Sequence, residues 1–274
     1  MQLQVIATDL DGTFLDHAGQ YPRRAFDQLL GRCRDLKIRV VIATGDPYGH
    51  VLDLFGSLTN RQQLTFVVED GALIVAGNGA VLSETAIPQS QWREAVAWLQ
   101  ESPMMAQNYL IACGRERAYT ELPADSERFH ASRVFYPQLT SVPRLTAVNE
   151  AILKLDITWK RSDIHEQVVA FNHQFAGDLW ATSSGLGGMN VSLPGVSKAS
   201  ALNLLGQKWG IPAKAMAAFG DSGNDLAMLQ LVGQGFVVGN GASELLAQIP
   251  RHLGNHDDGV VLKQMQHWID EAGQ

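Results

Sequence analysis

The sequence predicts an α/β protein in which a parallel-sheet core is interrupted by an inserted α+β domain. Apolar strands alternate with amphipathic helices near both ends of the chain, and several of these strands end in a polar cluster. Between residues 84 and 188 the alternation is lost. Strand, helix and strand in this order are typical of a Rossmann-like sheet, whose ligands gather at the carboxyl ends of the strands.

The composition is that of an ordinary globular protein. The chain has 274 residues, 46% hydrophobic and 18% charged, and a formal net charge of −7. This length accommodates two domains and a substantial core. The negative charge and the lack of a Lys/Arg cluster argue against nucleic acid or an anionic membrane as a partner. No apolar run is long enough to span a bilayer and the N-terminus has no export pattern, so we expect a cytoplasmic protein.

The first part of the core, residues 1–83, begins with the apolar run Val5-Ile6-Ala7-Thr8. Apolar residues at helical or alternating spacing predict the elements that follow. These are a helix over 23–37, a strand over 38–43, a helix over 47–58, a strand over 65–68 and a hairpin of 72–75 with 80–83.

Residues 84–188 are expected to form the inserted α+β domain. Its predicted helices cover 91–100, a segment after Pro123, and 163–175. Its predicted strands cover 109–113, 118–122, 153–159 and 179–183. Cys33 and Cys113 fit no metal or redox spacing, and we expect both to be reduced structural thiols.

The alternating pattern returns after Gly187-Gly188, and we expect residues 189–274 to complete a discontinuous core with residues 1–83. The predicted strands here are 189–193, 215–219 and 236–238, and the predicted helices are 197–209, 226–231, 243–249 and 260–271.

The first polar cluster is Asp9-Leu10-Asp11-Gly12-Thr13, directly after the opening strand. Strand side chains alternate between faces, so Asp9 and Asp11 start on the same side. Proteins accept such repulsion when a cation or a shared proton compensates it. Taken alone, the pattern leaves two interpretations open, an Asp-Gly turn and a metal-assisted phosphoryl site.

Further polar clusters follow two other predicted strands. Thr44-Gly45 leads into a helix N-terminus, an arrangement that offers donors to an anion, and Asp46 before Pro47 is typical of a helix N-cap. Lys198 starts a helix and by itself is typical of a solvated lysine. The segment Gly220–Asp225 follows the strand over 215–219, and its acids are also typical of a helix N-terminus. In a parallel sheet these clusters meet at one edge.

In this order, D-x-D-G-T, T-G, K and G-D-x-x-N-D resemble the four motifs of the haloacid dehalogenase superfamily, in its magnesium-dependent phosphatase branch. The large insertion between the second and third motifs is similar to that of Cof-type sugar phosphatases with a type IIB cap. The resemblance implies Asp9 as the nucleophile and Asp11 as general acid and then base. It implies Mg²⁺ bound by Asp9, the Asp11 carbonyl and Asp221, with Asp225 as outer support. The implied phosphoryl-binding groups are the Leu10 backbone, Thr44, Gly45, Lys198 and Asn224.

The function implied is Mg²⁺-dependent hydrolysis of small phosphorylated metabolites, foremost sugar phosphates, through an aspartyl phosphate. Two alternatives stay open, a phosphomutase on the same scaffold and a non-catalytic phosphoacceptor switch. We expect no nucleic-acid or membrane partner, and a monomer or small homo-oligomer. Three positions depart from what relatives commonly carry. Asp46 and Asn190 bear on specificity, and Asp70, in the predicted turn Glu69-Asp70-Gly71, changes either a substrate contact or only a hydrogen bond.

Overall fold

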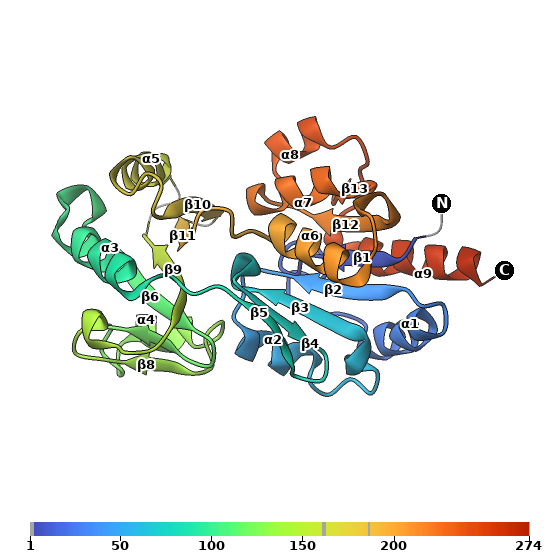
Figure 1. Ribbon diagram of the computed structural model, residues 1–274, viewed down its shortest axis with the longest axis horizontal. Helices are drawn as coiled ribbons and strands as arrows, with labels where there is room; N and C mark the ends of the chain where they lie inside the picture. Colours follow the sequence, from blue (N-terminus) through green and yellow to red (C-terminus); the bar gives the residue numbers. More distant parts are fainter. Residues whose placement is uncertain (1–2, 161–162, 186, 274) are drawn as a thin grey trace. The chain divides into compact units, whose positions relative to one another are not determined.

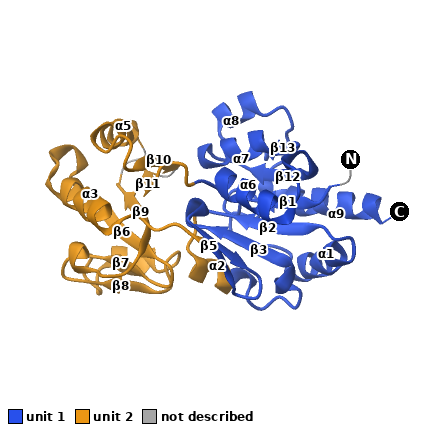
Figure 2. Cartoon of the chain, in the orientation of Figure 1, with its two compact units in different colours: residues 1–44, 54–83, 197–274 blue, residues 45–53, 84–196 orange. Residues whose placement is uncertain are grey.

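The computed structural model describes residues 3–160, 163–185 and 187–273 (Figure 1). Internal contacts divide the chain into two compact units (Figure 2). Unit 1 comprises residues 1–44, 54–83 and 197–274, and unit 2 comprises residues 45–53 and 84–196. The domain division expected from the sequence differs from these units at 45–53 and at 189–196.

Unit 1 contains the alternating strands and helices that the sequence predicts. In chain order they are β1 (Val5–Thr8), α1 (Arg23–Asp35), β2 (Arg39–Ala43), β3 (Leu64–Val68), β4 (Leu73–Ala76), β5 (Val81–Glu84), α6 (Lys198–Trp209), β12 (Met216–Gly220), α7 (Leu226–Leu231), β13 (Gln234–Val237), α8 (Ser243–Gln248) and α9 (Val260–Ala272). Helix α2 (Tyr48–Phe55) crosses the division between the units.

These strands form a seven-stranded sheet in the order β13-β12-β1-β2-β3-β4-β5. The pairs from β13 to β3 are parallel, and β4 is antiparallel to β3. Thr8, the last residue of β1, is in register with Phe219 of β12 and Ile42 of β2. The residues that follow these three strands therefore lie at one edge of the sheet, and the predicted parallel core is confirmed.

Alternation along the strands gives the sheet two apolar faces. Val5 and Ala7 of β1 pack in a cluster with Leu202 and Leu205 of α6. On α1, Phe26 lies 6.0 Å, centroid to centroid, from the Phe55 ring, and belongs to a set of neighbouring aromatic rings. That set is Phe14, Tyr21, Phe26, Phe55 and Phe66. A sheet covered on both faces explains why its central strands read as continuous apolar runs.

Unit 2 is built around a second sheet, with strand order β10-β11-β9-β6-β7-β8. The strands are β6 (Tyr109–Gly114), β7 (Ala118–Thr120), β8 (Leu139–Ser141), β9 (Ile152–Thr158), β10 (Trp180–Gly185) and β11 (Gly188–Ser192). The helices are α3 (Gln89–Glu101), α4 (Glu127–Ser132) and α5 (His165–Gln174). Trp92 and Phe171, from α3 and α5, pack on the sheet in one apolar cluster.

Strand β11 is placed differently from the expectation. Residues 189–193 were expected in the parallel core, but β11 pairs antiparallel with both β9 and β10. Met189 and Val191 join the unit 2 cluster, while Asn190 alternates with them. This alternation is typical of an antiparallel strand with one apolar face, and the glycine pair before it was misread as a boundary.

Both cysteines, Cys33 and Cys113, are free and buried. Over the described residues, no helix combines the length and the apolar character needed to cross a membrane.

Candidate active site

The candidate site begins in the turn after β1. Asp9 is 5% exposed, whereas the Asp11 side chain is exposed. The Leu10 carbonyl accepts hydrogen bonds from three successive amides, those of residues 13 to 15, at 2.9–3.1 Å. Gly12 has φ of +71°, and a Cβ there would come within 2.6 Å of Asp221 Oδ2. A glycine at this position is therefore needed for the turn and for Asp221 to approach it.

Lys198 is held at the first residue of α6. Ser197 caps the helix, and a reciprocal hydrogen bond with Ser200 completes a capping box. The Lys198 ammonium lies 2.7 Å from Asp9 Oδ1 and 2.8 Å from Asp225 Oδ1, and its side chain is 1% exposed. A buried ion triad thus joins residues from the two ends of the chain.

Asp225 is fully buried and its carboxylate is already engaged. Its Oδ2 accepts hydrogen bonds from the backbone N–H groups of Asp221 and Ser222, both at 3.1 Å. Since Oδ1 binds Lys198, Asp225 fixes the loop after β12 and orients the lysine.

Asp221 has a partner, Thr13, that was not predicted as a site residue. The Thr13 hydroxyl donates to Asp221 Oδ1 at 3.0 Å, across 208 residues of sequence. The signal was present, because Thr13 ends the D-x-D-G-T motif, but its contact depends on the tertiary fold.

The cluster carries more negative than positive charge. Burial, and next the Asp225 carboxylate, raise the pKa of Asp9 well above its ordinary value, against the opposing effect of Lys198. Burial and Asp225 also raise the pKa of Asp221. Burial alone would lower the pKa of Lys198, but the carboxylates of Asp225, Asp9 and Asp70 raise it. Each shift is what surplus negative charge in a poorly solvated site produces.

The donor set fits a hard divalent cation. One carboxylate oxygen from each of Asp9, Asp221 and Asp225 lies within 4.8 Å of the others. Anionic oxygen ligands are those that Mg²⁺ prefers, and a divalent ion would offset the charge that raises the pKa of Asp9 and Asp221. The Asp11 carboxylate is not part of this group. The resemblance implies that Asp11 binds Mg²⁺ through its backbone carbonyl, not through its carboxylate.

The remaining predicted phosphate-binding residues come from the ends of other strands. Thr44, which follows β2, is 2% exposed, and its carbonyl accepts the Asp70 N–H at 3.1 Å. The Asn224 amide donates to Asp70 Oδ1 at 3.0 Å. Unit 1 therefore brings together Asp9, Thr44, Lys198, Asp221, Asn224 and Asp225, with Asp70 in direct contact.

Gly45 belongs to unit 2, where its carbonyl accepts a hydrogen bond from the Lys154 ammonium at 2.5 Å. Lys154 is 2% exposed and was missed by the sequence analysis. The available signal was a lysine inside the predicted strand over 153–159. Asn190, one of the departures from the resemblance, is 8% exposed and stands in register with Asp156.

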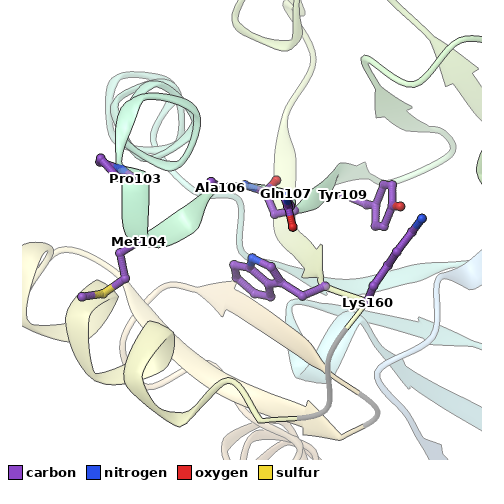
Figure 3. Close-up of a pocket in the computed structure, with 8 residues that line it drawn as sticks. Pro103, Met104, Ala106, Gln107, Tyr109 and Lys160 are labelled. Carbon is purple, nitrogen blue, oxygen red and sulfur yellow. The ribbon is translucent and has the colours of Figure 1, made fainter.

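A separate cavity of about 620 Å³ lies in unit 2 (Figure 3). Its lining residues are Pro103, Met104, Ala106, Gln107, Asn108, Tyr109, Trp159 and Lys160. They include one lysine and no carboxylate, so this cavity does not offer the chemistry of the acidic cluster in unit 1.

The chain is similar to known proteins over nearly its whole length. The model of the haloacid dehalogenase-like hydrolase family matches residues 6–265. The 5-amino-6-(5-phospho-D-ribitylamino)uracil phosphatase YbjI of Escherichia coli (strain K12) is 28% identical over 263 residues, covering 95% of this chain and 94% of that protein. The HMP-PP phosphatase of Serratia proteamaculans is 27% identical over 273 residues, covering 97% and 95%. The crystal structure of SMU.1108c from Streptococcus mutans UA159 superposes with a TM-score of 0.91 at 27% identity, covering 98% and 100%.

The chain therefore belongs to the haloacid dehalogenase-like hydrolase family, and the resemblance carried by the four motifs is confirmed. Family and relatives together make it an enzyme of the phosphoric monoester hydrolase class.

Proposed function

We propose that this enzyme is a Mg²⁺-dependent phosphatase that hydrolyses small phosphorylated metabolites, foremost sugar phosphates, through an aspartyl phosphate on Asp9. The observation that carries the proposal is the buried Asp9–Lys198–Asp225 triad, with Asp221 beside it at the edge of the sheet. Phosphoryl transfer depends mainly on positioning and charge neutralisation, and this cluster supplies both.

In the first step an Asp9 carboxylate oxygen attacks phosphorus, and the bond from phosphorus to the ester oxygen breaks. Asp11 gives its proton to the leaving oxygen. In the second step Asp11 takes a proton from water as the water oxygen attacks phosphorus. The bond from phosphorus to the Asp9 oxygen breaks, which releases inorganic phosphate and restores the Asp9 carboxylate. The exposure of Asp11 suits a group that exchanges protons with substrate and water.

The phosphoryl oxygens are held by the Leu10 amide, Thr44, Gly45, Lys198 and Asn224. Asp9, the Asp11 carbonyl and Asp221 would hold Mg²⁺, and Asp225 keeps the Asp221 loop and Lys198 in place. When bound, the cation supplies charge neutralisation between the nucleophilic carboxylate and the phosphoryl group.

Residues 84–196 of unit 2 form the proposed specificity domain. The name of the E. coli relative describes a phosphorylated ribityl chain on a uracil, and we extend the substrate class to such phosphorylated polyols. We further propose a cytoplasmic enzyme, monomeric or a small homo-oligomer, without a nucleic-acid or membrane partner.

The test is release of inorganic phosphate from a panel of sugar phosphates, 5-amino-6-(5-phospho-D-ribitylamino)uracil, HMP-PP and an aryl phosphate. Each is assayed with Mg²⁺ and with chelator, for wild type, Asp9→Asn and the control Asp35→Asn on the exposed surface of α1. We expect release that needs both Mg²⁺ and Asp9 and is unchanged in Asp35→Asn. An isomeric sugar phosphate as product would indicate the mutase, and a long-lived phosphoprotein without phosphate release would indicate the phosphoacceptor.

A further inference from the structure

The turn after β3 has an unusual backbone. Glu69 and Asp70 have φ of +50° and +56°, and Gly71 follows with φ of +106°. Both non-glycine residues are buried, at 1% and 8% exposed. Lys37 and Gln107, the other non-glycine residues with positive φ in the described part of the chain, are both exposed. A buried left-handed pair costs free energy and persists where the surrounding structure requires that turn.

The turn touches three parts of the site described above. The Asp70 N–H donates to the Thr44 carbonyl at 3.1 Å, and the Asp70 carboxylate accepts from the Asn224 amide at 3.0 Å. A Cβ on Gly71 would come within 2.4 Å of the Ser197 carbonyl, so the turn also packs closely against the start of the helix that carries Lys198. One turn therefore contacts the loops after β2 and β12 and the beginning of α6.

Asp70 determines which way the Asn224 amide points. A carboxylate has no proton to donate, so the nitrogen of Asn224, and not its oxygen, faces Asp70. The Asn224 oxygen accepts a hydrogen bond from the Ser222 hydroxyl at 2.6 Å, but a hydroxyl also accepts and would tolerate either orientation. The carboxylate at position 70 is thus the group that selects one orientation, and it leaves the amide nitrogen with a second N–H.

We infer that Asp70 is a positioning residue for the proposed phosphoryl-binding groups. The Asp70 carboxylate orients the Asn224 side chain so that the second N–H of the Asn224 amide is available to a phosphoryl oxygen. The inference rests on the proposed function and adds a residue that acts through Asn224. A side-chain amide at position 70 could donate as well as accept, and would allow Asn224 to turn over.

The main variant is Asp70→Gly, because glycine adopts the left-handed backbone without strain while the carboxylate is lost. Asp70→Asn keeps an acceptor but removes the selection of one orientation. Asp27→Ala is the matched control, since Asp27 of α1 accepts the Asn60 N–H at 2.8 Å and neither residue belongs to the site. Thermal unfolding of each variant verifies that it folds.

Three quantities are measured with Mg²⁺ present: the Kd of inorganic phosphate by calorimetry, and KM and kcat for an aryl phosphate. We expect Asp70→Gly to weaken phosphate binding about tenfold, the typical effect of losing one hydrogen bond near a charged group. Asp70→Asn has a smaller effect on phosphate binding, and Asp27→Ala leaves Kd, KM and kcat unchanged.

A double-mutant cycle separates this role from a merely structural one. Because Asp70 acts through Asn224, Asp70→Gly adds little to the loss already caused by Asn224→Ala. Independent, multiplying losses in the two variants, or unchanged phosphate binding in Asp70→Gly, would overturn the inference while the phosphatase assignment stands. A folded wild-type chain that neither hydrolyses a phosphate ester nor binds phosphate would overturn both.

Discussion

Two lysines are buried in the described part of the chain, one in each unit, and their surroundings differ. Lys198 starts a helix of unit 1 and bridges the carboxylates of Asp9 and Asp225. Lys154 lies in the middle of β9 in unit 2 and donates to the backbone carbonyl of Gly45. Both are at most 2% exposed. Burial of a lysine therefore does not by itself indicate catalysis; the partners of the ammonium do.

The comparison is tested most strongly by replacing each lysine with methionine. Lys198→Met removes the cation from two buried carboxylates and from the phosphate pocket, and we expect kcat/KM to fall about 10²- to 10³-fold. Lys154→Met leaves a carbonyl without its ammonium donor, and we expect a loss of about 1–3 kcal/mol in the free energy of unfolding with less than about a tenfold change in kcat/KM.

The measurements are phosphate release and urea unfolding, with Lys160→Met as the control for an exposed lysine of unit 2. Equal losses of kcat/KM in Lys154→Met and Lys198→Met would show that the two lysines have equivalent roles and would refute the comparison.

A second pair of variants replaces two acidic residues near Lys198, Asp225 and Asp221, and tests what each carboxylate contributes to stability. Asp225→Asn breaks a fully buried ion pair and disturbs two backbone hydrogen bonds, and we expect the free energy of unfolding to fall by about 3–5 kcal/mol. Asp221→Asn is expected to raise the free energy of unfolding in protein treated with chelator. Burial raises the pKa of Asp221 in the folded protein. The contribution of this carboxyl group to stability is therefore full below its pKa in the unfolded chain, and it is lost as pH rises through its pKa in the folded chain.

Above its folded pKa the ionised Asp221 therefore destabilises the metal-free fold, and in that pH range Asp221→Asn should unfold at a higher temperature than wild type. The same variant should lose the rise in melting temperature that Mg²⁺ gives the wild type, since it lacks a metal-binding carboxylate. A metal-free Asp221→Asn that is less stable than wild type would contradict this assignment of charge.

Cys33 provides a buried titratable group outside the ion triad. Burial raises the pKa of Cys33 from an ordinary value of 9.0 to about 12. The contribution of Cys33 to the free energy of unfolding is therefore full below about pH 9. It falls as pH rises toward 12, because the Cys33 thiol ionises first in the unfolded chain. We expect this thiol to account for a loss of about 1.4 kcal/mol between pH 7 and pH 10. Urea unfolding of wild type and Cys33→Ala at both pH values measures it, and identical pH dependence in the two proteins would contradict the shift.

The smallest effect is expected at an exposed ion pair. Arg32 Nη1 and Asp270 Oδ1 lie 2.6 Å apart, but the side chains of the two residues are 47% and 59% exposed. Arg32→Ala should change the free energy of unfolding by less than about 1 kcal/mol, and added salt should reduce the difference further. A loss as large as that of Asp225→Asn would mean that exposure does not separate strong from weak ion pairs in this protein.

The parallel core was predictable because burial on both faces gives its strands continuous apolar runs that end in polar residues. The strand over residues 38–43 and its neighbours follow this pattern, and their ends meet as expected. Strand β8 was missed because three residues without an apolar repeat carry little signal. Strand β11 was grouped with the wrong sheet because a single strand does not reveal its partners.

The site residues divide in the same way, into those that local motifs predict and those whose contacts depend on the tertiary fold. Asp9, Lys198 and Asp225 were predicted from motif order, and the structure places them within hydrogen-bonding distance. Asp70 was interpreted as a turn residue whose effect was left open between a substrate contact and a hydrogen bond, and it accepts one from Asn224. The contacts of Thr13 and Lys154 span more than a hundred residues each, so no local pattern carries them.

The central claim is that Asp9 accepts the phosphoryl group. The most direct test is an acid quench during single turnover, using the fastest substrate of the panel with labelled phosphorus and Mg²⁺ present. We expect label bound to the wild-type protein within the first turnover, located on Asp9 by peptide mapping, and absent from Asp9→Asn. Rapid phosphate release with no labelled protein at any time point, or label on another residue, would contradict the claim.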